Sequence, residues 1–281
     1  RYPLVTGVQT CALPIFPLRP TCAAVLLAGA AAAAHGETTP YYIGSSLSYS
    51  HQSNVLGLAD GQDVTPALTQ LGYTSKSDNV TSLALVGGFD QQISRQRLYG
   101  DLTLRNNHYS RNDLLNNNSY ALSGGLDWQT IERLSGKLTL RANRDLLRYS
   151  SVDQPTGVKN LVSTRQADLS ARLGGVTDLT FEAGAGYRSV DYSDQRYDPS
   201  DNDQAYGSLG VRYWPSGATS FGTSVRQTHG RYPRYRTPTG GEIQADNFDR
   251  TDVDLAAWLE LSGFTNLYAR LSHTQIGRAH V

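Results

Sequence analysis

Apolar and polar side chains alternate along most of this 281-residue chain. In residues 119–129, Tyr120, Leu122, Leu126 and Trp128 fall on one side of an extended segment, and small or polar residues fall on the other. Successive side chains of a β-strand point to opposite faces, so this period of two predicts a strand with one apolar face. The pattern predicts about eleven strands of roughly ten residues. They are expected at residues 43–49, 80–89, 98–105, 119–129, 134–143, 166–173, 179–188, 208–213, 221–227, 252–259 and 267–271.

The links between these strands alternate in length. Short links are expected at residues 91–95, 130–133, 174–178, 215–217 and 261–264, and long polar links at residues 52–79, 107–118, 147–162, 193–203 and 228–247. Outer-membrane barrels are built in this way, with tight periplasmic turns and longer external loops. One-sided strands also occur in soluble sandwiches, but Greek-key connections give no reason for a regular alternation of link length.

The chain is therefore predicted to be all-β, a transmembrane antiparallel up-and-down β-barrel with about eleven strands and an end before its C-terminal strands. Tyr120 and Trp128 stand eight residues apart, or roughly 20 Å along the membrane normal, as expected for two aromatic girdles. Twelve apolar residues are expected to face lipid. They are Leu102, Leu104, Leu122, Leu126, Leu138, Leu140, Leu169, Leu173, Phe181, Leu209, Val211 and Leu255.

Both ends of the chain depart from this pattern. Residues 6–15 resemble a short-read sequencing adapter in translation, and residues 276–281 resemble the opposite adapter, so residues 1–15 and 276–281 are expected to be artefacts outside the barrel wall. Residues 16–36 have a basic lead, a short apolar run and a small-residue exit, which predicts a partial secretory signal peptide. A buried Ala-rich helix is the alternative. Residues 37–275 would then form the barrel and contain no cysteine.

Charge and local motifs exclude several functions. The chain has 25 basic and 25 acidic residues, with three of the arginines outside residues 37–275. This slightly acidic balance argues against nucleic-acid binding, which needs a basic excess. The histidines His35, His51, His108, His229 and His273 have no metal-ligand spacing, and no nucleophile elbow is present. We therefore predict no enzyme activity, no catalytic residue, no metal and no cofactor.

Charged residues fall on the polar side of the predicted strands. Nine cations are candidates for lining a pore, namely Arg105, Lys137, Arg141, Arg172, Arg188, Arg212, Arg226, Arg250 and Arg270. The acids Asp101, Asp127, Asp168, Glu182, Asp252 and Asp254 share their side. These charges are interpreted either as cross-strand ion pairs that stiffen a wall or as an arginine-biased track for acidic solutes.

A second candidate lies in the last long link. Residues 229–242, HGRYPRYRTPTGGE, alternate basic and aromatic groups, and tyrosine faces can stack on sugar rings. The sugar-contact candidates are Arg231, Tyr232, Arg234, Tyr235 and Arg236. An ordinary exposed loop is the alternative interpretation.

Three stretches resemble one family of proteins. Residues 46–61, SLSYSHQSNVLGLADG, are similar to the first strand and following segment of EpsL-type exopolysaccharide-biosynthesis proteins. Residues 94–129, SRQRLYGDLTLRNNHYSRNDLLNNNSYALSGGLDWQ, resemble the next hairpin, and residues 246–275 are also similar. The wider group of β-barrel porin-2 proteins fits as well. This resemblance implies an outer-membrane barrel of a Gram-negative bacterium, exported through the periplasm, that lets an exported polysaccharide leave the cell.

The partners expected from these observations are outer-membrane lipid, a polysaccharide that is anionic if the arginines form its track, and other export-machinery proteins. Two alternative functions remain open at this point. One is a general diffusion porin for small solutes, and the other is a structural or adhesive barrel whose lumen is plugged by side chains.

Overall fold

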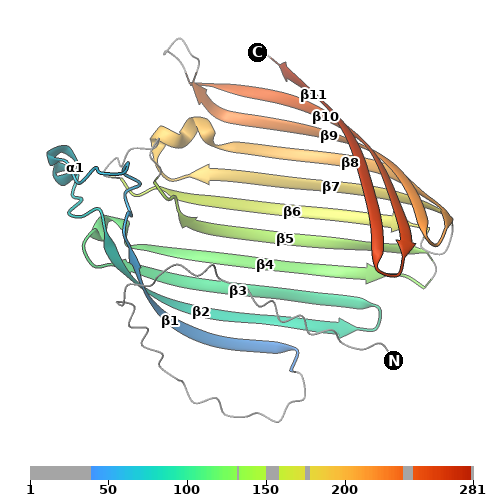
Figure 1. Ribbon diagram of the computed structural model, residues 1–281, viewed down its shortest axis with the longest axis horizontal. Helices are drawn as coiled ribbons and strands as arrows, with labels where there is room; N and C mark the ends of the chain where they lie inside the picture. Colours follow the sequence, from blue (N-terminus) through green and yellow to red (C-terminus); the bar gives the residue numbers. More distant parts are fainter. Residues whose placement is uncertain (1–38, 132, 150–157, 175–177, 237–242, 280–281) are drawn as a thin grey trace. The chain divides into compact units, whose positions relative to one another are not determined.

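Eleven β-strands form a single antiparallel sheet in sequence order, from β1 at one edge to β11 at the other (Figure 1). The structure, a computed structural model, describes residues 39–131, 133–149, 158–174, 178–236 and 243–279. The strands are β1 (Tyr41–Gln52), β2 (Asp78–Ile93), β3 (Gln96–Tyr109), β4 (Asn117–Gln129), β5 (Leu134–Leu146), β6 (Leu161–Leu173), β7 (Leu179–Tyr192), β8 (Asn202–Ser216), β9 (Thr219–Arg236), β10 (Ile243–Ser262) and β11 (Thr265–Ala279). The predicted all-β meander is confirmed, and the described residues form one sheet instead of a two-sheet sandwich.

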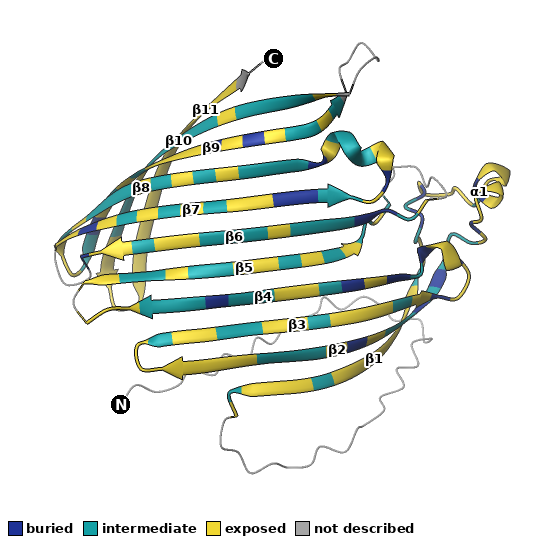
Figure 2. Ribbon diagram, turned by 180° about the vertical axis from the view of Figure 1, so that it is seen from behind, coloured by how far each residue is buried: buried dark blue, intermediate teal, exposed yellow. Residues whose placement is uncertain are grey.

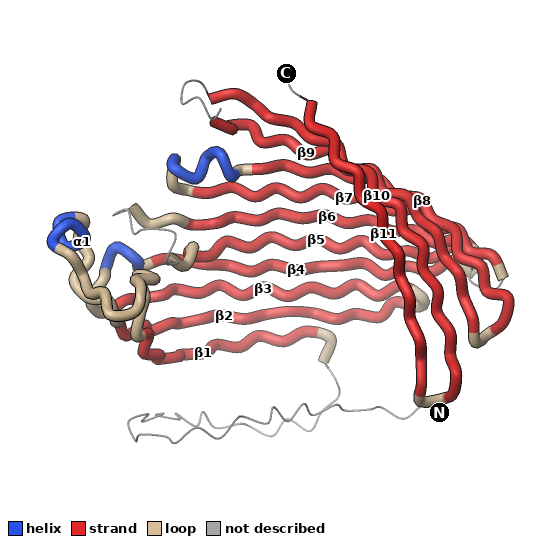
Figure 3. Tube along the Cα trace, turned by 45° about the horizontal axis from the view of Figure 1, so that its top comes forward, coloured by secondary structure: helices blue, strands red, loops and turns tan. Residues whose placement is uncertain are grey.

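The sheet is open. β1 and β11 are its two edge strands and do not pair with each other. The sheet curves most on the side of β9, β10 and β11, which turn across the face of the earlier strands in Figures 1 and 3. Curvature of this kind follows from the right-handed twist between neighbouring strands.

Short and long links lie at opposite ends of the strands, as the sequence predicts. Short links follow β2, β4, β6, β8 and β10, and the β2–β3 link consists of Ser94 and Arg95 alone. We call the two ends of the sheet the short-link end and the long-link end. Two predicted long links, residues 107–118 and 228–247, are much shorter because strand pairing continues into them. Polar residues in these segments hide the alternation, but backbone pairing does not depend on it.

The long links of this predominantly β structure contain three short helices within the described residues. They are α1 (Pro66–Gln70), η1 (Asp113–Leu115) and η2 (Gln195–Ser200). Thr65 begins α1 as its N-cap, accepting a hydrogen bond from the Leu68 amide at 3.4 Å, and Pro66 occupies the first turn. None of the helices in the described part of the chain has the length and apolar character needed to cross a bilayer.

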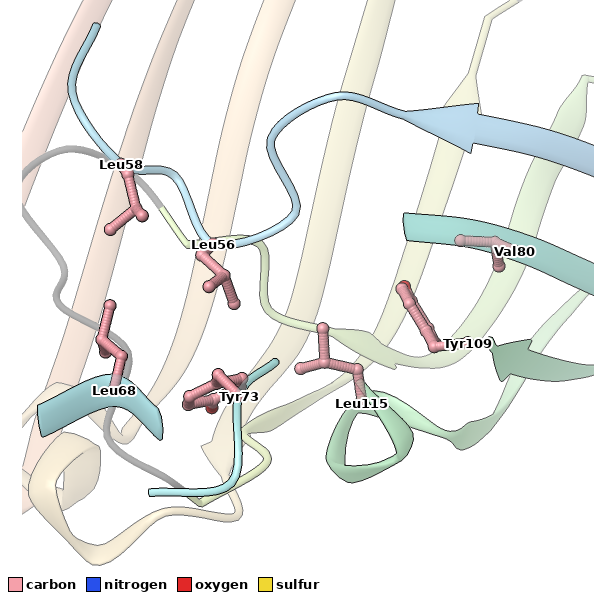
Figure 4. Packing of buried hydrophobic residues seen from close by; sticks show 7 residues of the cluster. All are labelled: Leu56, Leu58, Leu68, Tyr73, Val80, Tyr109 and Leu115. Carbon is pink, nitrogen blue, oxygen red and sulfur yellow. The ribbon is translucent and has the colours of Figure 1, made fainter. Parts of the chain in front are cut away.

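One small hydrophobic cluster lies at the long-link end of β1 to β5. Its buried members are Leu56, Leu58, Leu68, Tyr73, Val80, Tyr109 and Leu115, shown together in Figure 4. Most of them come from the β1–β2 link, which the sequence predicts to be a long polar link without a hydrophobic cluster. We call this cluster the cap. Elsewhere few strand residues are buried (Figure 2).

The expectation that residues 276–281 stay outside the sheet is wrong for Ile276 to Ala279. These residues continue β11, with Ile276 opposite Arg250 and Gly277 opposite Asp249. Pairing at an edge needs only an extended backbone with free donors and acceptors, so it does not depend on where the segment comes from. The predicted artefact at residues 1–15 and the predicted signal peptide at residues 16–36 lie outside the described residues.

Candidate functional site

Strand register places all nine candidate cations on one face of the sheet. Arg105 lies opposite Ser119, Lys137 opposite Asp127, and Arg141 opposite Gln166, and the unbroken period of two carries this face along each strand. The six acids predicted to accompany the cations share the face. We call it the polar face. The prediction that these side chains lie on one side is therefore confirmed, while a role for them in a pore stays a prediction.

The opposite face is apolar and exposed. Leu98, Leu126, Leu138 and Leu169 lie opposite one another on four successive strands. All twelve residues predicted to face lipid fall on this face, which we call the apolar face. Leu209 is 72 % exposed and Leu255 is 52 % exposed, whereas the polar residues beside them on β8 and β10 are half-buried. A soluble protein would hide such a surface, because large exposed apolar patches are costly in water.

Five of the nine cations form ion pairs on the polar face. Glu182 on β7 lies between Arg172 on β6, at 3.2 Å, and Arg212 on β8, at 3.4 Å. The other pairs are Lys137–Asp127 at 3.6 Å, Arg250–Asp252 at 2.9 Å and Arg270–Asp254 at 2.8 Å. These pairs tie neighbouring positions of the sheet together, as the ion-pair interpretation predicts.

Three other cations, Arg105, Arg141 and Arg188, form no ion pair within the described residues. Arg141 and Arg188 lie in one row across the sheet, separated by Gln166 on β6. Their strands are two steps apart, or about 10 Å. The acid in this row, Asp101, accepts a 2.6 Å hydrogen bond from Ser123. The row therefore presents two exposed guanidinium groups whose charge is available to an anion.

Tyr206 and Arg226 form a second feature of the polar face. The Tyr206 hydroxyl donates to Asp168 at 2.8 Å, and the same carboxylate accepts from the Gln166 amide at 2.8 Å. The Arg226 guanidinium lies 4.5 Å from the centre of the Tyr206 ring, so this cation has an aromatic partner instead of an acid. Tyr206 and Arg226 line a hollow of about 760 Å³ that also includes Arg141.

Tyrosine rings on the polar face lie over glycines of the adjacent strand, a feature that we did not predict from the sequence. Tyr206 covers Gly186, and Tyr99 covers Gly125. Arg97 and Lys137 lie 5.0 and 5.5 Å from the centre of the Tyr99 ring. A glycine lets an aromatic ring lie flat against the backbone of its cross-strand neighbour. The signal exists in the sequence only once the register is known.

Residues 229–236 of the basic and aromatic segment form a strand, where the sequence predicts part of a long link. Arg231, Tyr232, Arg234, Tyr235 and Arg236 all belong to β9, and residues 237–242 lie outside the described part. Strand pairing separates these residues, because Arg231 falls on the apolar face opposite Asp203 and Asn247.

Two members of this segment have partners that fix them to the sheet. Arg234 bonds to the buried Asp201 and lies 3.6 Å from Asp198, which ties β9 to η2. The Tyr232 ring packs against Phe248 at 5.9 Å between centres. A single sugar-binding cluster of all five residues is therefore not formed.

Comparisons with known proteins identify no relative, since no protein-family model and no curated protein matches the chain. Among the described residues, no group of three or more His, Cys, Asp or Glu side chains is placed to hold a metal ion.

Proposed function

We propose that this sheet is part of the wall of an outer-membrane β-barrel that takes part in the export of an extracellular polysaccharide, as a conduit or accessory pore. The supporting observation is the difference in polarity between the two faces of the sheet. One face carries exposed apolar side chains, and the other carries the nine candidate cations and the six acids. Lipid outside and water inside a barrel satisfy both faces at once.

The apolar side chains of the apolar face form a band that runs at an angle to the rows of hydrogen-bonded partners. This angle supports a position in a membrane. Following opposite partners from Tyr41 at the short-link end of β1 leads, after ten steps, to Gly277 in β11. On β11, however, the first apolar residue of this face after the short link is Leu267, ten residues earlier. The band therefore shifts by about one residue per strand relative to the hydrogen-bond rows.

This shift corresponds to a definite strand tilt. With a rise of about 3.3 Å per residue and about 4.8 Å between strands, one residue per step gives an angle of about 35°. The apolar band is level only if the strands are inclined by that amount, and transmembrane barrels have strand tilts of about 35–45°. Tyr213 on β8 shows nearly the same shift. The row that begins at Tyr41 reaches Ala205 after seven steps, and Tyr213 lies eight residues from Ala205, which is again about one residue per step.

The side chains of the polar face support the proposal that the transported solute is anionic. Arg141 and Arg188 offer planar guanidinium groups that match carboxylates, and they are exposed. Tyr99 and Tyr206 add ring surfaces of the kind that pack against sugars. Polysaccharide as the cargo rests on the resemblance to EpsL-type proteins. An export role places the chain in the outer membrane of a Gram-negative bacterium, in contact with lipid and with other export proteins.

Conductance across a planar bilayer tests this proposal. Acidic oligosaccharides, such as oligogalacturonate, should block ion flow through the reconstituted protein more strongly than neutral maltooligosaccharides. The double variant Arg141→Gln with Arg188→Gln should weaken the acidic block about tenfold or more, since two charge-assisted contacts are lost. A matched control, Arg144→Gln with Arg165→Gln, removes the same charge from the apolar face. Acidic oligosaccharides should block this control as strongly as they block the parent protein.

Other results would replace the proposal with one of its alternatives. Equal block by acidic and neutral sugars would favour a general diffusion porin. The absence of conductance in protein that has entered the bilayer would favour a barrel plugged by its own side chains.

A further inference from the structure

Two arginines, Arg144 on β5 and Arg165 on β6, lie on the apolar face. Arg144 is opposite Tyr120 and Ser163, and Arg165 is opposite Ala142 and Ser189. Since Ser163 and Arg165 are two residues apart on one strand, the two arginines are diagonal neighbours on the same face. Diagonal neighbours across antiparallel strands are about 7–8 Å apart.

Neither arginine has an acidic partner among the described residues. The buried Nε of Arg144 has no hydrogen-bond acceptor, and Arg165 is exposed. Two acids of this face have other donors. Asp191, which lies opposite Ser163, accepts from Ser189 at 3.3 Å, and Asp203 accepts from Tyr187 at 2.9 Å. Two like charges held side by side without a counter-charge are unfavourable unless an anion joins them.

The slant of the apolar band explains why arginines occur on this face. The uninterrupted run of apolar positions on this face ends at Ala142 on β5 and at Ala167 on β6, and Arg144 and Arg165 are the next positions towards the long links. Leu146 and Leu161, which lie farther out on the same face, are half-buried and buried. Tyr120 lies directly opposite Arg144. Aromatic residues next to the end of an apolar band mark the membrane interface, where lipid headgroups begin. The arginine pair therefore stands at headgroup height just beyond the band.

We propose that Arg144 and Arg165 bind the phosphate groups of an anionic lipid in the leaflet at the long-link end. Each guanidinium can hold a phosphate through two parallel hydrogen bonds. A pair spaced about 7–8 Å apart suits a headgroup with two phosphates, or two anionic lipids side by side. A zwitterionic lipid carries an ammonium group that offsets its phosphate, so it fits the pair less well. The inference rests on the membrane position in the proposed function, and does not depend on polysaccharide transport.

Native mass spectrometry of the folded protein in micelles tests the inference, with dioleoylphosphatidylglycerol and dioleoylphosphatidylcholine as competing probes. The parent protein should retain phosphatidylglycerol in preference to phosphatidylcholine. Arg144→Gln with Arg165→Gln should lower that preference by about tenfold or more, since two charge-assisted contacts are lost. Arg144→Lys with Arg165→Lys keeps the charge without the planar fork and should lose only part of the preference.

The matched control is Arg141→Gln with Arg188→Gln, which removes the same charge from the polar face. It should leave the lipid preference unchanged while weakening the block of conductance by acidic sugars. Equal loss of lipid preference in both double variants, or no preference in the parent protein, would overturn the lipid site. A lipid preference in protein that does not conduct would support the site and count against the transport role. Failure of the protein to associate with lipid at all would overturn both.

Discussion

The ring of Tyr206 on β8 lies flat over Gly186, its direct partner on β7. A Cβ atom at residue 186 would overlap this ring and would also come within 2.8 Å of the Asp168 carboxylate. The glycine is thus what allows Tyr206 to reach Asp168 along the polar face.

Replacing this glycine should destabilise the sheet. We expect Gly186→Val to push the Tyr206 ring away, break its hydrogen bond to Asp168 and lower the free energy of unfolding by about 1–3 kcal/mol, as overpacking does. Urea unfolding of the protein in micelles measures this. Gly207→Val is the control, because a Cβ at residue 207 would meet no atom within 4 Å. Equal effects at both positions would show that the ring contact is unimportant.

The two faces should respond in opposite ways to a new charge. Leu140 on the apolar face and Thr139 on the polar face are consecutive residues of β5. Leu140→Arg should cost about 2–4 kcal/mol in a bilayer, because it puts a charge near the middle of the apolar band. Thr139→Arg should cost much less, since Thr139 lies opposite Asp168. Folding free energies in phosphatidylcholine vesicles distinguish the two, and similar costs would contradict the proposed orientation.

Glu182 should control how strongly the polar face attracts anions. Glu182→Gln releases Arg172 and Arg212 from their shared acid, so acidic oligosaccharides should block conductance more strongly in this variant than in the parent. The effect should weaken as salt is raised. Glu260→Gln makes the same change at an exposed residue near a short link and serves as the control. A block weaker than that of the parent would contradict the arginine track.

The cap should open independently of the sheet. Leu56→Ala removes a fully buried side chain, for which a cost of about 2–5 kcal/mol is usual, and the β1–β2 link should exchange its amide hydrogens faster. Leu71→Ala, at a position that is 42 % exposed, should have little effect. Hydrogen-exchange mass spectrometry separates the link from the strands. Faster exchange throughout β3 to β8 would show that the cap stabilises the whole sheet.

The cap should also lose stability in strong alkali. Burial raises the pKa of the Tyr149 phenol, and the hydrogen bond shared with Tyr73 at 2.9 Å raises that pKa further. The folded state thus favours the neutral phenol. Its contribution is complete below the ordinary tyrosine pKa of about 10 and is lost as the pH rises towards the folded-state value. Phenolate absorbance during a pH titration should include a late-titrating component that Tyr149→Phe removes.

The sequence predicts the faces of the strands better than it predicts contacts between them. Alternation is local, so residues such as Leu122 and Arg141 can be assigned to opposite faces from their own strands alone. The Glu182 bridge depends on how three strands align, and link composition does not determine that alignment. For the same reason, the pairing of Arg144 with Arg165 and the contact of Tyr206 with Gly186 emerge only from the register.

Two further differences between the sequence-based predictions and the structure have a common cause. Arg234 belongs to a segment that lacks apolar alternation and is therefore predicted as a link, but it lies in β9 and forms ion pairs with Asp198 of η2 and with Asp201, which ends that helix. Leu56 and Leu58 stand in a link rich in polar residues, and they are buried by contacts with distant parts of the chain. In both cases, tertiary contacts override what the local composition indicates.

The shift of one residue per strand also has a mechanical consequence. In the proposed orientation, the rows of hydrogen bonds are inclined to the membrane plane, so that each row rises steadily from one strand to the next. A force that pulls a hairpin out along the membrane normal acts mostly parallel to strands inclined by about 35°. It loads many backbone hydrogen bonds in shear at the same moment instead of unzipping them in sequence. Such a hairpin should resist extraction far more strongly than its number of hydrogen bonds suggests.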